Sequence, residues 1–103
     1  MRIELLHIED CPNTAKALEQ VEAALAAMGH EDVSVHLRHI RSPADTAGTG
    51  FAGSPTITAD GADIFPDGAP SNDLACRIYP TPEGHAGVPT VYQVMEALRN
   101  HGL

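Results

Sequence analysis

The stretch LLHIEDCPNTAKALEQV, residues 5 to 21, changes from one hydrophobic pattern to another and places a cysteine at the change. A short apolar run precedes the cysteine, as in strands that are buried on both faces; it consists of Ile3, Leu5, Leu6 and Ile8. From Asn13 to Met28, apolar residues recur at helical spacing, and Gly29 is a natural stop. The stretch therefore predicts a strand followed by a helix, with Cys11 at the junction.

Three patterns downstream predict further elements. Residues 33–40, VSVHLRHI, alternate apolar and polar side chains, which is the period of a strand. Ser42 and Pro43 are suited to the N-cap and first position of a short helix or turn. Residues 54–65, SPTITADGADIF, read as two strands joined by an Asp-Gly turn, which is a strong hairpin signal.

The C-terminal part of the chain predicts loops and one more helix. Residues 66–75 are rich in Pro, Gly, Asn and Asp and should form a loop, CRIY at 76–79 is a candidate extended piece, and a second loop is expected through Pro89. Thr90 and Gln93 form a capping box at the start of a final amphipathic helix. With no repeat or domain boundary, residues 1–103 form one domain.

The predicted order is β-α-β-α-β-β-α, which places the chain in the α/β class with a mixed sheet covered by helices. The first half should contribute parallel strands and the second half a hairpin. In such sheets, active groups gather outside the carboxyl ends of the parallel strands. Cys11 follows the first strand and should therefore lie at that edge.

Composition excludes several classes of function. The net charge of −8, with 14 acidic and 6 basic residues, disfavours nucleic acid or an anionic membrane as a partner. No run approaches the length of a membrane span, and the chain opens on strand-like residues rather than a signal peptide. We therefore expect a cytoplasmic protein, in which two cysteines are more commonly reactive than structural.

The position of Cys11 predicts a reactive thiol. If Cys11 is the N-cap and Pro12 the first helical residue, the sulfur faces the unpaired N–H groups and the positive end of the helix dipole. Both effects favour the thiolate, which is the nucleophilic form. The neighbouring Glu9 and Asp10 oppose it, but exposed carboxylates are screened by solvent, and we expect the helix terminus to dominate.

The segment GSPT at 53–56 is a second candidate feature. It places Pro55 at the start of a strand, where the missing N–H is tolerated. A cis Ser54–Pro55 bond would turn the chain and expose the backbone of Ser54 to an extended ligand. The sequence alone leaves the isomer open, because few X-Pro bonds are cis.

Taken together, CPN at 11–13, GSPT at 53–56 and CRIY at 76–79 resemble the thioredoxin-like superfamily. The likeness covers nearly the whole chain and is greatest to a small branch with CPN or selenocysteine-PN, GSPT and CRxY motifs, some of whose members are labelled alkylmercury lyase. The resemblance implies a redox thiol at Cys11, a facing cis-proline at Pro55 and a second thiol at Cys76.

The resemblance also implies a docking surface made by Pro12, Asn13, Ser54 and Pro55 for a thiol-containing small molecule or protein substrate, without a cofactor. The chain departs from the dithiol thioredoxin motif at Thr14, which stands where that motif has its resolving cysteine. The Thr14 hydroxyl can stabilise a thiolate at Cys11 but cannot resolve a disulfide.

Two routes for resolving a mixed disulfide at Cys11 therefore stay open. Cys76 resolves it if the loop at 66–75 brings the two cysteines close enough, and otherwise an external thiol must do so. The competing interpretation of Cys76 is a small buried hydrophobe beside Ile78.

Two other functions compete with thiol–disulfide exchange. His7, which is close to Cys11 along the first strand, is a candidate ligand of a soft metal or a mercurial together with Cys76 and His85. The chain would then be a non-enzymatic binding module, which could equally bind a peptide. No paired ligand spacing supports a metal site, however, so the sequence predicts none. The remaining alternative is an interaction domain in which Thr14 marks the loss of redox chemistry.

Overall fold

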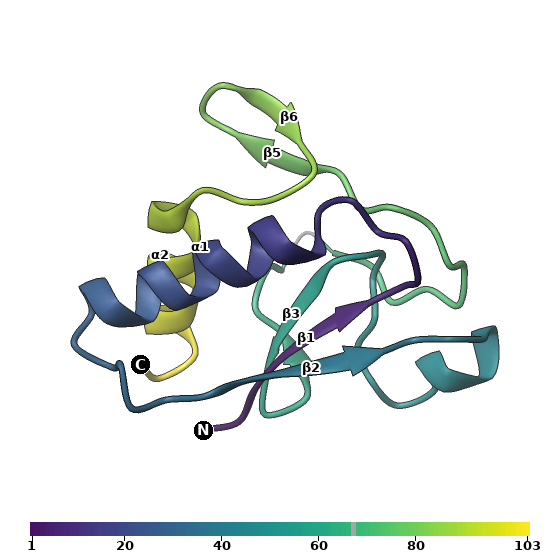
Figure 1. Cartoon of the computed structure of the whole chain (residues 1–103), viewed down its shortest axis with the longest axis horizontal. Coiled ribbons are helices and arrows are strands. Elements are labelled where there is room, and N and C mark those ends of the chain that lie inside the picture. The colour runs from purple at the N-terminus through teal and green to yellow at the C-terminus, as the bar shows by residue number, and fades with distance from the viewer. Residues whose placement is uncertain (67) are drawn as a thin grey trace.

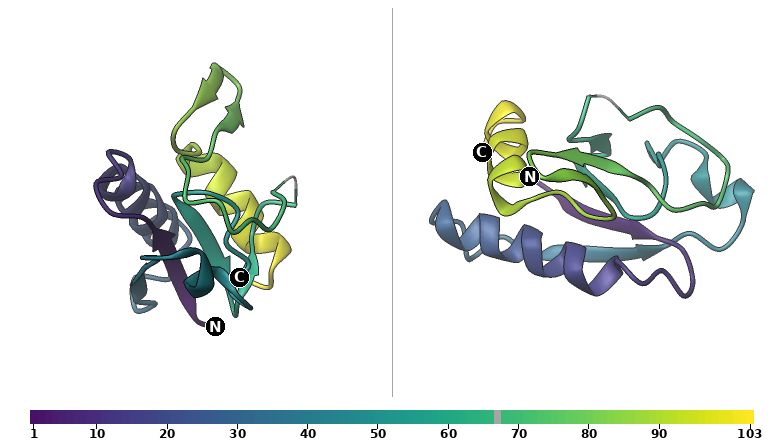
Figure 2. Two further views of the ribbon diagram at one scale, coloured as in Figure 1. Left: turned by 90° about the vertical axis from the view of Figure 1, so that its right-hand side faces the viewer. Right: turned by 90° about the horizontal axis from the view of Figure 1, so that it is seen from above.

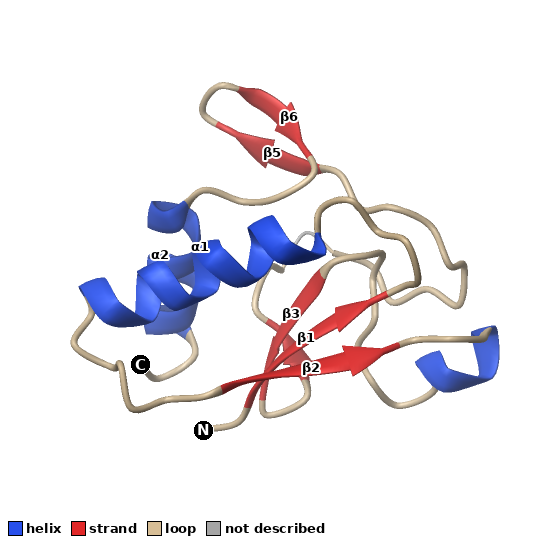
Figure 3. Ribbon diagram, in the orientation of Figure 1, coloured by secondary structure: helices blue, strands red, loops and turns tan. Residues whose placement is uncertain are grey.

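The computed structural model describes residues 1–66 and 68–103, which form α helices and β strands (Figures 1 and 3). Residue 67, within the loop predicted at 66–75, lies outside the described residues. The helical elements are α1 (Thr14–Ala27), the 3-10 turn η1 (Pro43–Thr46) and α2 (Val91–Asn100). The strands are β1 (Ile3–His7), β2 (Val35–His39), β3 (Thr56–Ala59), β4 (Ala62–Asp63), β5 (Tyr79–Thr81) and β6 (Gly84–Ala86).

The main sheet has four strands in the order β2-β1-β3-β4. β1 and β2 are parallel, with Ile3 opposite Val35, whereas β3 pairs antiparallel with both β1 and β4. The predicted mixed sheet is therefore confirmed. The predicted Asp-Gly turn between β3 and β4 is also confirmed: Asp60 and Gly61 both have positive φ, 52° and 86°, as a type I′ turn requires.

Both α helices pack on the same face of this sheet. Leu5 and Ile57, which are opposite each other on β1 and β3, belong to one core cluster with Val21 of α1 and Leu98 of α2. The two helices also contact each other (Figure 2). At about 25 cal/mol per Å² of apolar surface, this burial is the main force that holds the helices on the sheet.

The opposite face of the sheet carries a smaller apolar cluster. Leu6 points away from the helices and packs with Ile40 and Phe51, all three almost fully buried. β1 is thus buried on both faces, as its apolar run predicted. The first core fixes α1, and this second core fixes the segment that leads to Ser54.

Two boundaries differ from the sequence prediction. α1 begins at Thr14 with Asn13 as its N-cap, so Cys11 is not the N-cap. Residues 80–86, expected to be part of a loop, form the β5–β6 hairpin together with Tyr79, and this hairpin projects away from the main sheet (Figures 1 and 2). Pro80 and Pro82 concealed this hairpin, because proline within a run counts against a strand. The Thr90–Gln93 capping box is present as predicted, with both of its hydrogen bonds.

None of the helices in the described part of the chain is both long and apolar enough to span a membrane.

Candidate functional site

Cys11 lies in the turn that connects β1 to α1. Asp10 precedes it with φ of 57°, and the N–H of Thr14 points back to the Cys11 carbonyl at 3.4 Å. The helix begins only after this turn, with Asn13 as its N-cap. The Asn13 side chain makes no capping hydrogen bond and instead lies against Gly87. Cys11 is partly exposed and Pro12 is exposed.

The surroundings of Cys11 favour its thiolate, as expected, although it is not the N-cap. Burial is the largest single influence and raises the pKa of the thiol, because it disfavours a charge. Hydrogen bonds from the side chains of Ser54 and Thr14, and from the backbone of Asn13 and Thr14, lower the pKa. Together they outweigh burial, so the pKa lies below the ordinary value for cysteine.

The Ser54 side chain is the largest of these stabilising influences, and its orientation is fixed. Ser54 is fully buried, and its Oγ accepts a hydrogen bond from the N–H of Ile8 at 3.1 Å. A serine hydroxyl has one proton to donate. Because the Ile8 N–H occupies an acceptor position, the Ser54 proton is free to point at the Cys11 sulfur.

The Thr14 hydroxyl lies on the first turn of α1, as its position in the sequence predicts. Its Oγ1 is buried and has no hydrogen-bond partner that satisfies ordinary distance and angle limits, although its nearness lowers the pKa of Cys11. The missing hydrogen bond and the lowered pKa agree if the Thr14 hydroxyl lies near the Cys11 sulfur but is poorly aligned with it while the thiol is neutral. A buried hydroxyl without another partner gains most from a charged acceptor, here the thiolate.

Cys76 lies beside Ser54 in the segment that follows the long loop. Ser54 and Cys76 form an isolated parallel bridge, in which the Ser54 N–H donates to the Ala75 carbonyl at 2.8 Å and the Arg77 N–H donates to the Ser54 carbonyl at 2.9 Å. Both cysteines are free thiols. Cys76 and its neighbour Ile78 are exposed, so a buried apolar role for Cys76 is wrong. Ser54 is thus a common neighbour of the two thiols.

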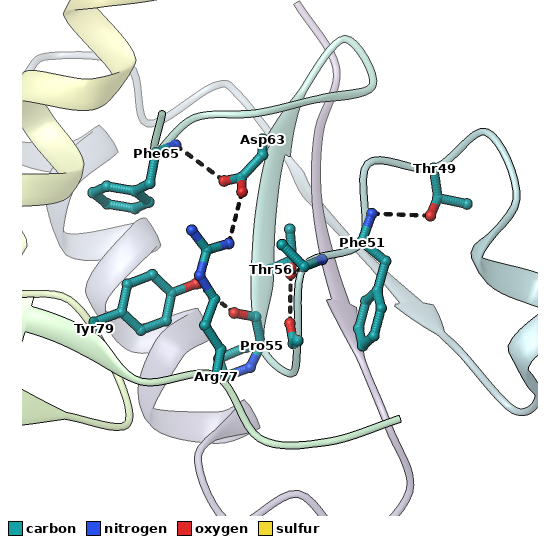
Figure 4. Close-up of polar contacts among 10 residues, drawn as sticks. Thr49, Phe51, Pro55, Thr56, Asp63, Phe65, Arg77 and Tyr79 are labelled. Carbon is teal, nitrogen blue, oxygen red and sulfur yellow. Dashed lines mark hydrogen bonds and ion pairs between the residues drawn. The ribbon is translucent and has the colours of Figure 1, made fainter. Parts of the chain in front are cut away.

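Pro55 follows a cis peptide bond from Ser54, and a buried polar network surrounds it (Figure 4). The guanidinium of Arg77 pairs with the Asp63 carboxylate at 2.8 Å, with side chains only 6% and 13% exposed. The same guanidinium lies 4.6 Å from the ring centre of Tyr79, whose hydroxyl donates to the Pro55 carbonyl. The network joins β4, the segment at 77–79 and the loop before β3.

Arg77, Asp63 and Tyr79 were not predicted from the sequence as site residues. An arginine and an aspartate 14 positions apart in the sequence carry no local signal of contact. The side-chain role of Ser54 was also missed, because only its backbone was considered. A serine before a proline is too common a pair to predict a hydroxyl directed at a sulfur.

The histidines do not gather around the thiols as a metal site would require. The rings of His7 and His39, at the ends of β1 and β2, stack with centroids 5.1 Å apart. His85 lies on the β5–β6 hairpin. Across residues 1–66 and 68–103, no group of three or more His, Cys, Asp or Glu side chains is placed to hold a metal ion.

The site therefore consists of the partly exposed thiol of Cys11, with several hydrogen-bond donors, and the exposed thiol of Cys76. The residue after Cys76, Arg77, is held by its buried ion pair and is hydrogen-bonded to the backbone of Ser54. Comparisons of the chain with protein-family models, with curated proteins and with solved structures found no match.

Proposed function

We propose that this chain is a thioredoxin-like domain that carries out thiol–disulfide exchange with Cys11 as its nucleophile. The strand order β2-β1-β3-β4, the parallel β1–β2 pair and the helix directly after β1 are compatible with that fold. The observation that carries the functional proposal is the set of donors directed at Cys11, which lowers its pKa. A thiolate at neutral pH is what such an exchange requires.

The reaction proceeds in two displacement steps. The Cys11 thiolate attacks one sulfur of a disulfide RS–SR, forms the mixed disulfide Cys11–S–SR and releases RS⁻. The Cys76 thiolate then attacks the Cys11 sulfur, forms the Cys11–Cys76 disulfide and releases the second RS⁻. The substrate gains two electrons and the protein loses two, which an external small thiol must restore.

The roles follow from the contacts. Ser54 and Thr14 stabilise the Cys11 thiolate. Cys76 is the candidate resolving thiol because its two neighbours, Ala75 and Arg77, are hydrogen-bonded to the backbone of Ser54, which places it opposite Ser54. Thr14 stands where it would stabilise the attacking sulfur but supplies no thiol of its own. If Cys76 does not reach Cys11, an external thiol completes the second step.

The test is the pH dependence of alkylation at Cys11, followed in the wild type and in Cys76→Ser. Intact mass is measured after mild oxidation to detect an internal disulfide. A rate midpoint below about 8.5, with loss of two mass units that requires Cys76, is expected. An unshifted midpoint without an internal disulfide would rule the redox function out.

A shifted midpoint without loss of mass would retain Cys11 as the nucleophile and assign the second step to an external thiol. The control for nonspecific oxidation is the double variant Cys11→Ser/Cys76→Ser, which should keep its mass. The measurement thus separates the role of Cys11 from that of Cys76.

A further inference from the structure

The backbone beside the Cys11 sulfur is already occupied by the chain itself. Ser54, whose side chain contacts that sulfur, has both of its main-chain polar groups bonded to residues 75–77. Its N–H donates to the Ala75 carbonyl at 2.8 Å, and its carbonyl accepts from the Arg77 N–H at 2.9 Å. We call residues 75–77 the filling segment.

The residue after Ser54 has no free main-chain group for a polypeptide either. Pro55 has no N–H, and its carbonyl accepts a hydrogen bond from the Tyr79 hydroxyl. An extended polypeptide that adds to a sheet edge obtains its affinity mainly from such main-chain donors and acceptors. At Ser54 and Pro55 these groups are all used or missing, so the exposed docking backbone that the sequence suggested is not free.

The filling segment is held firmly at this edge. Arg77 is buried and its ion pair with Asp63 is 2.8 Å long, and breaking one partner of a buried pair leaves an uncompensated charge. The backbone also packs closely, because a Cβ placed on Gly53 would lie 2.9 Å from the Arg77 Cβ. A polypeptide would have to displace this anchored segment before it could pair with Ser54.

We infer that residues 75–77 fill the polypeptide-docking edge beside Cys11 and thereby restrict its substrates to low-molecular-weight disulfides. The inference rests on the proposed exchange reaction and adds the class of substrate. A small disulfide needs only to approach the partly exposed sulfur of Cys11. In the first step its S–S bond breaks, one half joins Cys11 and the other leaves as a thiolate, and a small thiol of the same class later reduces the protein.

The test compares two probes that release the same coloured thiolate. One is the mixed disulfide of cysteamine with thionitrobenzoate, and the other is the same mixed disulfide made on the single cysteine of a flexible ten-residue peptide. Both react with a Cys76→Ser background, so that only Cys11 is measured. Each rate is divided by the rate of that probe with free 2-mercaptoethanol at the same pH, which removes differences in intrinsic reactivity.

We expect the normalised rate for the cysteamine probe to exceed that for the peptide by at least about threefold. The peptide finds no free backbone to pair with, and residues 75–77 occupy the place beside Ser54 that its chain would need. Equal rates, or a faster peptide, would overturn the inference while leaving the exchange function in place. If neither probe reacts faster with the protein than with free 2-mercaptoethanol, the proposed exchange function fails, and the inference fails with it.

Loosening the filling segment gives an independent test. Asp63→Asn removes the charge that holds Arg77, and we expect the normalised peptide rate to rise at least about threefold while the cysteamine rate changes less than about twofold. Glu4→Gln is the matched control, because Glu4 is also 13% exposed and pairs with Arg2 and Arg38 elsewhere on the sheet. It should change neither rate.

Tyr79→Phe is the companion variant if Asp63→Asn does not fold, as judged by circular dichroism. It removes the hydrogen bond to the Pro55 carbonyl and leaves the ion pair intact. A rise in the peptide rate alone supports the inference. A peptide rate that stays unchanged in every folded variant, or a parallel rise of both rates, contradicts a specific filling role for residues 75–77.

Discussion

At the scale of single residues, the lowered pKa of Cys11 depends on a hydroxyl that lies 43 positions away in the sequence. Ser54 accepts from the Ile8 N–H and is left with one proton, which is free to point at the sulfur. The sequence predicts a lowered pKa at Cys11, and the surroundings of Cys11 lower it for a partly different reason. The helix begins at Thr14 rather than at Cys11, so hydroxyls join the helix N–H groups in stabilising the thiolate.

Ser54→Ala should therefore raise the pKa of Cys11 and slow its alkylation at pH 7. The loss should stay below about tenfold, because the sulfur is partly exposed and keeps its other donors. Iodoacetamide rates across pH 5–10 measure the midpoint directly. Ser71→Ala is the control, since Ser71 accepts only a local bond from the Asp73 N–H. An unchanged midpoint in Ser54→Ala would remove Ser54 from the thiol site.

The lowered pKa of Cys11 also makes stability depend on pH. Between the native pKa and the unfolded value near 8.5, the unfolded chain binds more protons than the native one, so the stabilisation by the thiolate grows as pH rises. It is complete above the unfolded pKa and is lost as pH falls through the native pKa. Urea unfolding of the wild type and of Cys11→Ala, both reduced, should differ increasingly across this window. A difference that stays constant, or that shrinks as pH rises, would contradict a lowered pKa of Cys11 in the native protein.

At the scale of elements, the Arg77–Asp63 pair fastens the segment before β5 to β4. Arg77→Met leaves the Asp63 carboxylate almost buried without its partner, and we expect a loss of about 3–5 kcal/mol in the free energy of unfolding. The matched control is Arg38→Met, whose pair with Glu4 is 3.8 Å long and whose side chain is 49% exposed. That variant should lose less than about 1 kcal/mol. Similar losses of unfolding free energy in the two variants, measured by urea unfolding, would show that the buried Arg77 pair stabilises no more than the exposed Arg38 pair.

The elements differ in how far the sequence reveals them. α2 and the β3–β4 hairpin were predicted because their signals are local: a capping box beginning at Thr90 and an Asp60-Gly61 turn. The β5–β6 hairpin was missed because two prolines lie in residues 79–82, and its register is supported from outside by a hydrogen bond from Gln93 to the Pro80 carbonyl. Local patterns predict elements that local chemistry stabilises, and they miss elements that depend on distant contacts.

At the scale of the whole molecule, the site combines three stretches that are far apart in the chain. Residues 11–14 bring the thiol, residues 54–55 the hydroxyl and the turn, and residues 75–79 the second thiol and the anchoring network. Each stretch was singled out from the sequence as a motif. The resemblance implied that Pro55 faces Cys11. The place of residues 75–79 was not predictable, because it depends on how the long loop before them returns the chain to the edge beside Ser54.

The same arrangement predicts how oxidation changes the stability of the whole domain. A Cys11–Cys76 disulfide would close a loop that contains β2, β3 and β4, and such a long loop stabilises by up to about 4 kcal/mol through the unfolded state. The gain should be smaller, because oxidation gives up the hydrogen bonds that Ser54 and Thr14 offer the thiolate. Urea unfolding of oxidised and reduced protein, with oxidant-treated Cys76→Ser as the control, measures the difference. An oxidised form that is less stable than the reduced one would mean that the bond distorts the packing around Ser54, and that the pair acts as an oxidant rather than a reductant.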